Sequence, residues 1–311
     1  MKTLALTGAS GFVGAAVARR FADAGWRVRA LVHSRPLLLE LEEAGVTALR
    51  GGLNDPASLA ELAAGADAVV HCAALIKARR PQDFFTVNRD GARELGQAAS
   101  GAGARMLFIS SLAARQPELS DYAASKAAGE AVVAAIGGLR WDTIRPPAVY
   151  GEGDPETLKL LRWIARGLAP VPAGPAARLS LIHVSDLAGA ALAWAERGDT
   201  TQTVYEVDDG CAGGRSWPEI VGVAAAALGV RPIVFAAPAP LLVAGAAAYE
   251  GLARAFGRTP MVTAGKAREL CWPDWRCAPE PFQARFGWRP ERDLETGLRE
   301  TLDWYRKAGW L

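Results

Sequence analysis

The first half of the chain alternates short apolar runs with longer amphipathic segments. The apolar runs are "KTLALTG", "WRVRALVH", "VTALRGG", "ADAVVHCAA", "RMLFISS" and "WDTIRPP", and the segments between them have helical length and are rich in Ala, Leu, Glu and Arg. Strands that alternate with helices form a parallel sheet whose right-handed crossovers cover both faces. The pattern therefore predicts an α/β fold with a doubly wound parallel sheet.

After about residue 150 this rhythm is lost. Proline and glycine are frequent in "GEGDPETLK" and "GLAPVPAGPAARLS", and the helical segments that follow are separated by few strands, chiefly "TQTVYEV". We predict a main domain at residues 1–165 and a smaller, mainly helical lobe at residues 166–311. The pattern leaves open the return of a segment around residues 179–207 to the main domain.

One stretch, "PIVFAAPAPLLVAGAAAYE" at residues 232–250, is almost uninterruptedly apolar. A helix that spans a membrane needs roughly 20 apolar residues that stay helical. Three prolines lie in the first nine residues of this stretch, and proline ends or kinks a helix. We therefore expect no membrane span, but a short strand from Ile233 to Phe235 and then a buried or interface helix from about Pro240. The alternative is a helix that lies on a membrane surface.

Composition narrows the range of partners. The net charge is only +2, and the sequence contains neither a block of like charges nor a basic stripe, so we expect no nucleic-acid partner. The cysteines form no CxxC pair and have no histidine at ligand spacing, so we expect neither a metal site nor a disulfide framework. The opening "MKTLALTG" enters a strand directly, without the pattern of a signal peptide, so we expect a cytoplasmic protein.

The first strand is followed by a glycine turn, "LALTGASGFVG", which places Gly8, Gly11 and Gly14 at the opening of the first helix. Glycine lets the backbone bend tightly and approach a pyrophosphate, whose charge is stabilised by the N–H groups at the start of the helix. The spacing is GxxGxxG and differs from the GxGxxG fingerprint, and a plain tight turn is the alternative. The context of strand, turn and helix favours a dinucleotide site.

The residues after the second strand bear on the choice of cofactor. An NAD site usually places an acid there for the ribose 2′-hydroxyl, whereas an NADP site offers a cation to the 2′-phosphate. This chain has His33, Ser34 and Arg35 at that point and no acid. The pattern favours NADP over NAD, the alternative being that Arg35 is a solvated arginine beside a turn.

Tyr122 and Lys126 are four residues apart, which on a helix places them on the same face. A nearby ammonium would lower the pKa of the phenol and make it an acid/base group. Ser111 follows the strand "RMLFIS" at the edge where open α/β sheets bind ligands, and its hydroxyl would hold a carbonyl oxygen beside the phenol. Ser110 is the alternative for this role. The motif YxxxK alone is common and usually forms a solvated helix face. Its occurrence together with the serine and the glycine turn favours a catalytic site.

The chain resembles an extended short-chain dehydrogenase/reductase of the NAD-dependent epimerase/dehydratase superfamily. The resemblance runs through "TGASGFVG", "GADAVVHCAA", "VNRDG", "SSLAA", "YAASK", "IRPPAVYG" and "SLIHVSDLAGA", and so covers nearly the whole chain. It implies a Rossmann-type main domain that binds NAD(P) and a C-terminal lobe that binds a small-molecule substrate. It also implies a homodimer, in which the helices that contain Asn88 and Tyr122 form a four-helix bundle.

The resemblance also assigns residue roles. It makes Ser111, Tyr122 and Lys126 the catalytic triad, with Lys126 also bonding the nicotinamide ribose, and it places the backbone around Val149 at the carboxamide. The full set that we predict to bind the cofactor is Gly8, Ser10, Gly11, Phe12, Val13, Gly14, His33, Ser34, Arg35, Leu53, Asn54, Ala73, Ala74, Asn88, Tyr122, Lys126, Pro146 and Val149.

Two positions depart from the family pattern. Gly52 stands where relatives often have an acid that contacts adenine, so Leu53 and Asn54 must serve there or the adenine is held more loosely. The loop between Ser111 and Tyr122 is short, which leaves less chain to build a wall of the substrate pocket.

The expected reaction interconverts a ketone and a secondary alcohol by hydride transfer, on a largely apolar small molecule. Relatives that act on nucleotide sugars tend to carry an asparagine before "VYG", where this chain has Pro147 and Ala148, and an uncompensated diphosphate is costly to desolvate. The second lobe is apolar, as a hydrophobic ligand requires. The alternative is a nucleotide-sugar epimerase with the same site, and less favoured is a non-catalytic subunit that senses a dinucleotide. Four arginines weigh against the apolar substrate, namely Arg145, Arg162, Arg166 and Arg178.

Overall fold

A seven-stranded parallel sheet forms the main layer of the protein. The computed structural model describes residues 1–172, 174, 176–260 and 262–311. The strand order is β11-β6-β5-β4-β1-β2-β3, and every pairing in this sheet is parallel. The strands are β1 (Thr3–Thr7), β2 (Arg27–Val32), β3 (Thr47–Arg50), β4 (Ala68–His71), β5 (Arg105–Ile109), β6 (Arg140–Arg145) and β11 (Val204–Glu206). The predicted doubly wound parallel sheet is confirmed.

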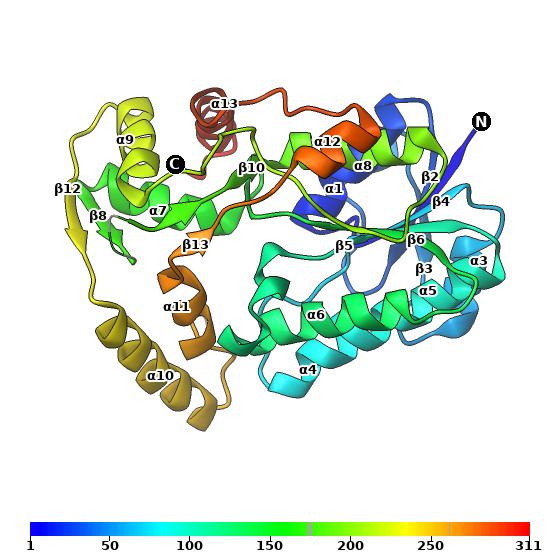
Figure 1. Ribbon diagram of the computed structural model, residues 1–311, viewed down its shortest axis with the longest axis horizontal. Coiled ribbons are helices and arrows are strands. Elements are labelled where there is room, and N and C mark those ends of the chain that lie inside the picture. The colour runs from blue at the N-terminus through cyan, green and yellow to red at the C-terminus, as the bar shows by residue number, and fades with distance from the viewer. Residues whose placement is uncertain (173, 175, 261) are drawn as a thin grey trace.

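Helices cover both faces of this sheet. Because side chains alternate along a strand, Leu4 and Leu6 of β1 enter one apolar core, which also contains Phe21, while Ala5 enters the opposite core with Leu95. Figure 1 shows α5 and α6 on one side of the sheet and α8 and α12 on the other. The helices of this domain are α1 (Phe12–Asp23), α2 (Leu39–Glu43), α3 (Pro56–Ala63), α4 (Pro81–Phe85), α5 (Gly91–Gly101), α6 (Asp121–Ala134) and α8 (Val184–Arg197), with a π-helical turn η1 (Thr86–Asp90) and 3-10 turns η2 (Leu112–Arg115) and η3 (Pro117–Leu119).

The second lobe has its own apolar core, formed by residues such as Leu158, Val221 and Leu302. Short parallel pairs of strands, β7 with β10, β8 with β12 and β9 with β13, frame its helices. The elements of the lobe and of its connections are β7 (Ala148–Tyr150), α7 (Pro155–Ala165), β8 (Leu168–Val171), β9 (Arg178–Leu179), β10 (Leu181–His183), α9 (Trp217–Leu228), β12 (Ile233–Ala236), α10 (Ala239–Ala255), α11 (Ala264–Cys271), β13 (Asp274–Trp275), α12 (Glu280–Phe286) and α13 (Leu294–Lys307).

The chain crosses between the two cores more than once. Helix α8 packs on α1, and Tyr205 of β11 pairs with Ile144 of β6, so the segment that ends near residue 207 adds to the main sheet. Phe282 of α12 also lies in the main core. Helix α7 packs in the core of the second lobe, although it ends at residue 165 and so lies within the predicted bounds of the main domain. The division at residue 165 stays a prediction.

The apolar stretch at residues 232–250 forms β12 and the first part of α10, as the prolines indicate. Only Ala246 and Ala253 of α10 are buried, so the expectation of a buried helix is wrong and the alternatives of an interface or a membrane surface remain. Among the described residues, no helix is long and apolar enough to cross a membrane.

Candidate active site

Close backbone packing forms the glycine turn. Gly8 has a φ of +82°, and a Cβ on it would lie 2.6 Å from the Ala73 nitrogen. A Cβ on Gly14 would lie 2.1 Å from the Gly8 carbonyl oxygen. Gly11 caps α1, and no side chain bonds the N–H groups of its first turn, whereas the Asp55 carboxylate caps α3. A diphosphate fits such a start of a helix, so the turn matches the binding site of a dinucleotide. Ser10, Phe12 and Val13 are half-buried around it.

His33, Ser34 and Arg35 follow β2 and are exposed. A Cβ on Gly52 would lie 2.8 Å from the Asn54 Oδ1 atom and 3.3 Å from the His33 ring. The side chains of His33 and Asn54 therefore occupy the space that the acid of many relatives would need. This contact gives a physical reason for glycine at position 52.

Asn88 is fully buried on the π-helical turn η1. Its Oδ1 atom accepts from the Leu75 nitrogen at 2.7 Å, and its Nδ2 atom donates to the Leu75 oxygen at 3.0 Å and to the Ser125 Oγ at 2.9 Å. The side chain thus ties the loop after β4, which contains Ala73 and Ala74, to α6. Asn88 positions that loop, and its role in cofactor binding stays a prediction.

Ser111 and Tyr122 come together at the carboxyl end of β5. Ser120 caps α6 by accepting from the Ala123 nitrogen at 3.0 Å, which sets Tyr122 in the first turn of the helix. The Ser111 hydroxyl is close enough to the Tyr122 phenol to lower its pKa, and the Phe84 ring of α4 lies 6.3 Å from the Tyr122 ring. The structure therefore brings the predicted serine close to the predicted tyrosine, which lies in the first turn of α6.

Ser110 faces the other way and serves a different network. Its Oγ donates to the Glu130 carboxylate at 2.5 Å, and Arg145 donates to both Glu130 oxygens at 2.8 and 2.5 Å. Sequence reasoning missed this buried network. The i, i+4 spacing of Lys126 and Glu130 on α6 was the local signal of this network, but it did not point to Arg145, which comes from β6. The network leaves Ser111 as the serine beside Tyr122.

Lys126 is almost fully buried and points to the end of β5. Its Nζ atom donates to the Ile109 oxygen at 2.7 Å and lies 4.3 Å from the centre of the Phe108 ring. Burial lowers the pKa of Lys126 to about 8, and the Glu130 carboxylate opposes that change. The Lys126 ammonium thus contacts the Ile109 carbonyl and the Phe108 ring at the base of the site.

The expectation that Lys126 lowers the pKa of Tyr122 is wrong for this structure. Burial raises the pKa of Tyr122 to about 12, the hydrogen bond with Ser111 opposes the rise, and the Glu269 carboxylate adds to it. The reason is geometric: the two residues share a helix face, but the ammonium is directed to the Ile109 carbonyl. The phenol is therefore protonated at neutral pH.

The second lobe reaches the site through α11. The Ser120 hydroxyl donates to the Glu269 carboxylate, and Arg268 donates to the Leu119 oxygen at 2.8 Å. Glu269 was not among the predicted residues, since nothing in its local sequence relates it to Tyr122. Docking of α11 therefore fixes the turn that carries Tyr122.

The remaining predicted positions frame the site through the backbone. The Pro146 oxygen accepts from the Leu112 nitrogen at 2.8 Å, which holds the residues after Ser111 beside β6. Val149 lies half-buried on β7, where it pairs with Ile182 of β10. Leu53 packs against Gly91 at the start of α5.

One group of side chains away from this site has the residue types of a metal site. Ligand atoms of Glu152, His183 and Glu300 lie within 4.8 Å of one another. The His183 Nδ1 accepts from the Ser185 nitrogen, so the Nε2 of the neutral ring carries the hydrogen. Glu300 accepts from Arg292 at 2.6 Å. Both contacts disfavour a cation at this place.

Comparison with known proteins identifies the family. The model of the NAD dependent epimerase/dehydratase family matches residues 4–207. The chain is 38% identical to the ceramide reductase of Caulobacter vibrioides over 312 positions, which span 99% of this chain and 96% of that protein. It is 28% identical to the 2-alkyl-3-oxoalkanoate reductase of Stenotrophomonas maltophilia, over 96% of this chain and 98% of that protein. The solved structure of gox2253 matches with a TM-score of 0.78 at 25% identity, over 100% of this chain and 99% of that one.

The chain belongs to the NAD-dependent epimerase/dehydratase family of extended short-chain dehydrogenases/reductases. It is an enzyme that uses a nicotinamide dinucleotide, as the glycine turn and the resemblance predicted.

Proposed function

We propose that the protein is an NADPH-dependent reductase that converts a ketone on a long-chain, ceramide-like lipid into a secondary alcohol. The observation that carries the proposal is the placement of Tyr122 beside Ser111 at the carboxyl end of β5, close enough for Ser111 to act on the pKa of the phenol. The relatives that match over nearly their whole length support the substrate class, because one is a ceramide reductase and another reduces 2-alkyl-3-oxoalkanoates.

The side chains suggest how reduction proceeds. The Ser111 hydroxyl donates a hydrogen bond to the substrate carbonyl oxygen, and Tyr122, which burial keeps protonated at neutral pH, gives that oxygen its proton. When bound, the reduced nicotinamide supplies the hydride that the carbonyl carbon accepts, so that hydride and proton together make the alcohol. Lys126 keeps a positive charge at the base of the site below a pH of about 8.

NADPH is preferred in this proposal because of the exposed segment after β2. Arg35 offers a guanidinium, which can bond a 2′-phosphate with two parallel hydrogen bonds, and His33 and Ser34 add further polar groups. The same segment has no acid that would instead bind a ribose 2′-hydroxyl.

A nucleotide-sugar epimerase is the second candidate, favoured by the family to which the chain belongs. An epimerase would need arginines to bind the diphosphate of its substrate. Two of the candidate arginines form hydrogen bonds with protein groups instead. Arg145 pairs with Glu130, and Arg162 donates to the Trp310 oxygen at 2.7 Å. These contacts favour the reductase over the epimerase.

The family resemblance also leads us to propose a homodimer, and the opening of the chain, which lacks the pattern of a signal peptide, leads us to propose a cytoplasmic location. The bundle would form through α5 and α6, which carry an open apolar pocket between Arg93 and Ile136. Sedimentation of the purified chain tests the dimer.

The experiment that tests the function compares Tyr122→Phe with the unaltered protein. With NADPH and an oxo-ceramide or a 2-alkyl-3-oxoalkanoate, we expect kcat to fall by at least about 100-fold, since the phenol proton is lost, while NADPH binding persists. Tyr205→Phe is the control, because it removes a hydroxyl that bonds Thr201 away from the site. Near-normal turnover by Tyr122→Phe refutes the role of Tyr122. Conversion of UDP-glucose to UDP-galactose, with no reduction of either lipid ketone, establishes the epimerase instead.

A further inference from the structure

The outward face of β12 and α10 is apolar. We call it the α10 surface and define it by Ile233, Phe235, Leu241, Tyr249, Leu252 and Phe256, each of which is exposed. Leu241 is 71% exposed and Phe256 is 73% exposed. In Figure 1, β12 and α10 follow one another along the margin of the molecule that lies away from the main sheet. A continuous apolar surface of this kind marks a place of docking.

The pattern within α10 is the reverse of that of an ordinary surface helix. Leu241, Tyr249, Leu252 and Phe256 are separated by eight, three and four residues, so they lie along one face. The small residues Ala246 and Ala253, about a quarter of a turn farther round the helix, are buried, and α10 packs on α11. Folding therefore buries the small residues and leaves the large apolar ones in contact with solvent.

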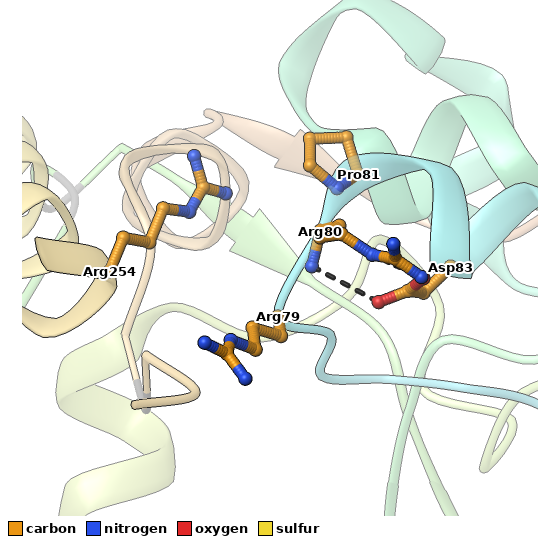
Figure 2. A pocket seen from close by; sticks show the side chains of 5 residues that line it. All are labelled: Arg79, Arg80, Pro81, Asp83 and Arg254. Atoms are coloured by element: carbon orange, nitrogen blue, oxygen red, sulfur yellow. Dashed lines mark hydrogen bonds and ion pairs between the residues drawn. The ribbon is translucent and has the colours of Figure 1, made fainter. Parts of the chain in front are cut away.

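Positive charge lies beside the apolar face. Arg79, Arg80 and Arg254 line an open pocket of about 670 Å³ between the C-terminal part of α10 and the start of α4, together with Pro81 and Asp83. Figure 2 shows the three guanidinium groups around this space.

Only part of this positive charge is neutralised. Arg80 pairs with Asp83 and Arg254 pairs with Glu250, whereas Arg79 makes no ion pair with any described residue. Arg258 is also exposed, just beyond α10, and Arg231 is exposed just before β12. The apolar face is thus bordered by net positive charge at both of its ends.

This surface adjoins the approach to Tyr122. Helix α4, whose first turn contributes to the arginine pocket, carries the Phe84 ring that contacts Tyr122. Helix α11, on which α10 packs, meets Ser120 at the start of α6, where a Cβ on Gly265 would lie 2.7 Å from the Ser120 Cβ. The same two helices therefore link the α10 surface to the reacting phenol.

We propose that the α10 surface docks the protein onto a lipid bilayer that contains anionic lipids, with its apolar side chains among the acyl chains and Arg79, Arg254 and Arg258 at the phosphates. Helices that lie on membranes combine an apolar face with cationic residues in this way. A second copy of the chain fits less well, because a twofold contact would set the same positively charged border against itself. Docking on a bilayer does not depend on the proposed function. Only the idea that a lipid ketone passes from the bilayer to Tyr122 rests on the proposed function.

The test is flotation of the purified protein with vesicles, without substrate or cofactor. We expect binding to vesicles of phosphatidylcholine and phosphatidylglycerol at 7:3 and much weaker binding to phosphatidylcholine alone. Leu252→Asp combined with Phe256→Asp should weaken binding at least about 30-fold, since two apolar side chains lose their burial. Arg79→Ala should weaken it by about fivefold, the contribution of one cation near an anionic surface, and added salt should do the same. Leu39→Asp is the matched control, because Leu39 is similarly exposed but lies on α2.

Several outcomes would overturn the proposal. One is absence of binding to either vesicle, and another is unchanged binding by the double aspartate variant with an unchanged circular dichroism spectrum. A third is a dimer in sedimentation that the double variant dissociates, with no vesicle binding, which would make the surface a contact between copies. If the double variant does not fold, Arg79→Ala and the salt dependence decide. Because no turnover is measured, failure of the reductase assignment leaves this test unaffected.

Discussion

Replacement of Lys126 by methionine should stabilise the fold while it abolishes turnover. Methionine has a length similar to that of lysine and carries no charge, and Lys126 is 1% exposed. Burial lowers the pKa of Lys126 from 10.5 to about 8. A lysine whose pKa is lower in the folded than in the unfolded chain destabilises the fold fully below pH 8, and this cost fades as the pH rises from 8 to 10.5.

The magnitude follows from the difference in pKa. A difference of about 2.5 units corresponds to roughly 3 kcal/mol of destabilisation at pH 7, because each unit is worth about 1.4 kcal/mol. The variant loses the hydrogen bond from Nζ to the Ile109 oxygen, which costs about 1 kcal/mol. The expected net gain is about 2 kcal/mol, or about 3 °C in Tm for a chain of this size.

Calorimetry at several pH values checks this prediction. The advantage of Lys126→Met should shrink by about 1 kcal/mol between pH 7 and pH 9, as the wild-type lysine loses its proton in the folded state. Lys307→Met, at the exposed end of α13, should change stability by no more than about 0.5 kcal/mol. A variant that is less stable than the wild type at pH 7, or whose advantage does not depend on pH, refutes the reasoning.

Three further predictions concern the cofactor and the neighbouring serine. Arg35→Ala should weaken the binding of NADPH by at least about tenfold and the binding of NADH by less than about twofold in titrations, because only NADPH carries the 2′-phosphate. Equal losses of affinity for the two cofactors would favour NAD. Ser111→Ala should lower kcat at least about tenfold, whereas Ser110→Ala should leave kcat near normal and cost about 1–2 kcal/mol in unfolding experiments, since Glu130 loses a donor; the reverse pattern would exchange the two roles. Gly14→Ala should destabilise the fold by about 1–3 kcal/mol and weaken binding of the cofactor. Gly101→Ala is the control and should leave stability unchanged, because a Cβ there meets nothing within 4 Å. Equal effects of the two substitutions would contradict the close packing of the turn.

Local patterns were sufficient for the elements and for much of the candidate site. The alternation of apolar runs and helical segments predicted the parallel sheet, since strand and helix periods are properties of neighbouring residues. The glycines of the first turn were recognisable because a strand followed at once by Gly8 and a helix that contains Gly14 require close backbone contacts within seven residues. The prolines before α10 similarly marked the end of β12.

Tertiary structure decided the direction in which side chains point and what covers them. Ser110 and Ser111 are adjacent in sequence, and the partner that separates their roles, Glu130, comes from α6. The i, i+4 spacing placed Lys126 on the face of Tyr122, but burial raises the pKa of the phenol and the ammonium bonds the Ile109 carbonyl on β5, so the expected effect on that pKa has the wrong sign. The apolar sequence of α10 suggested burial, yet α11 covers only its small residues. The spacing of apolar residues along the chain determines which side chains share a face of a helix or strand. Which segment packs against that face depends on residues far away in sequence, so only the folded structure shows it.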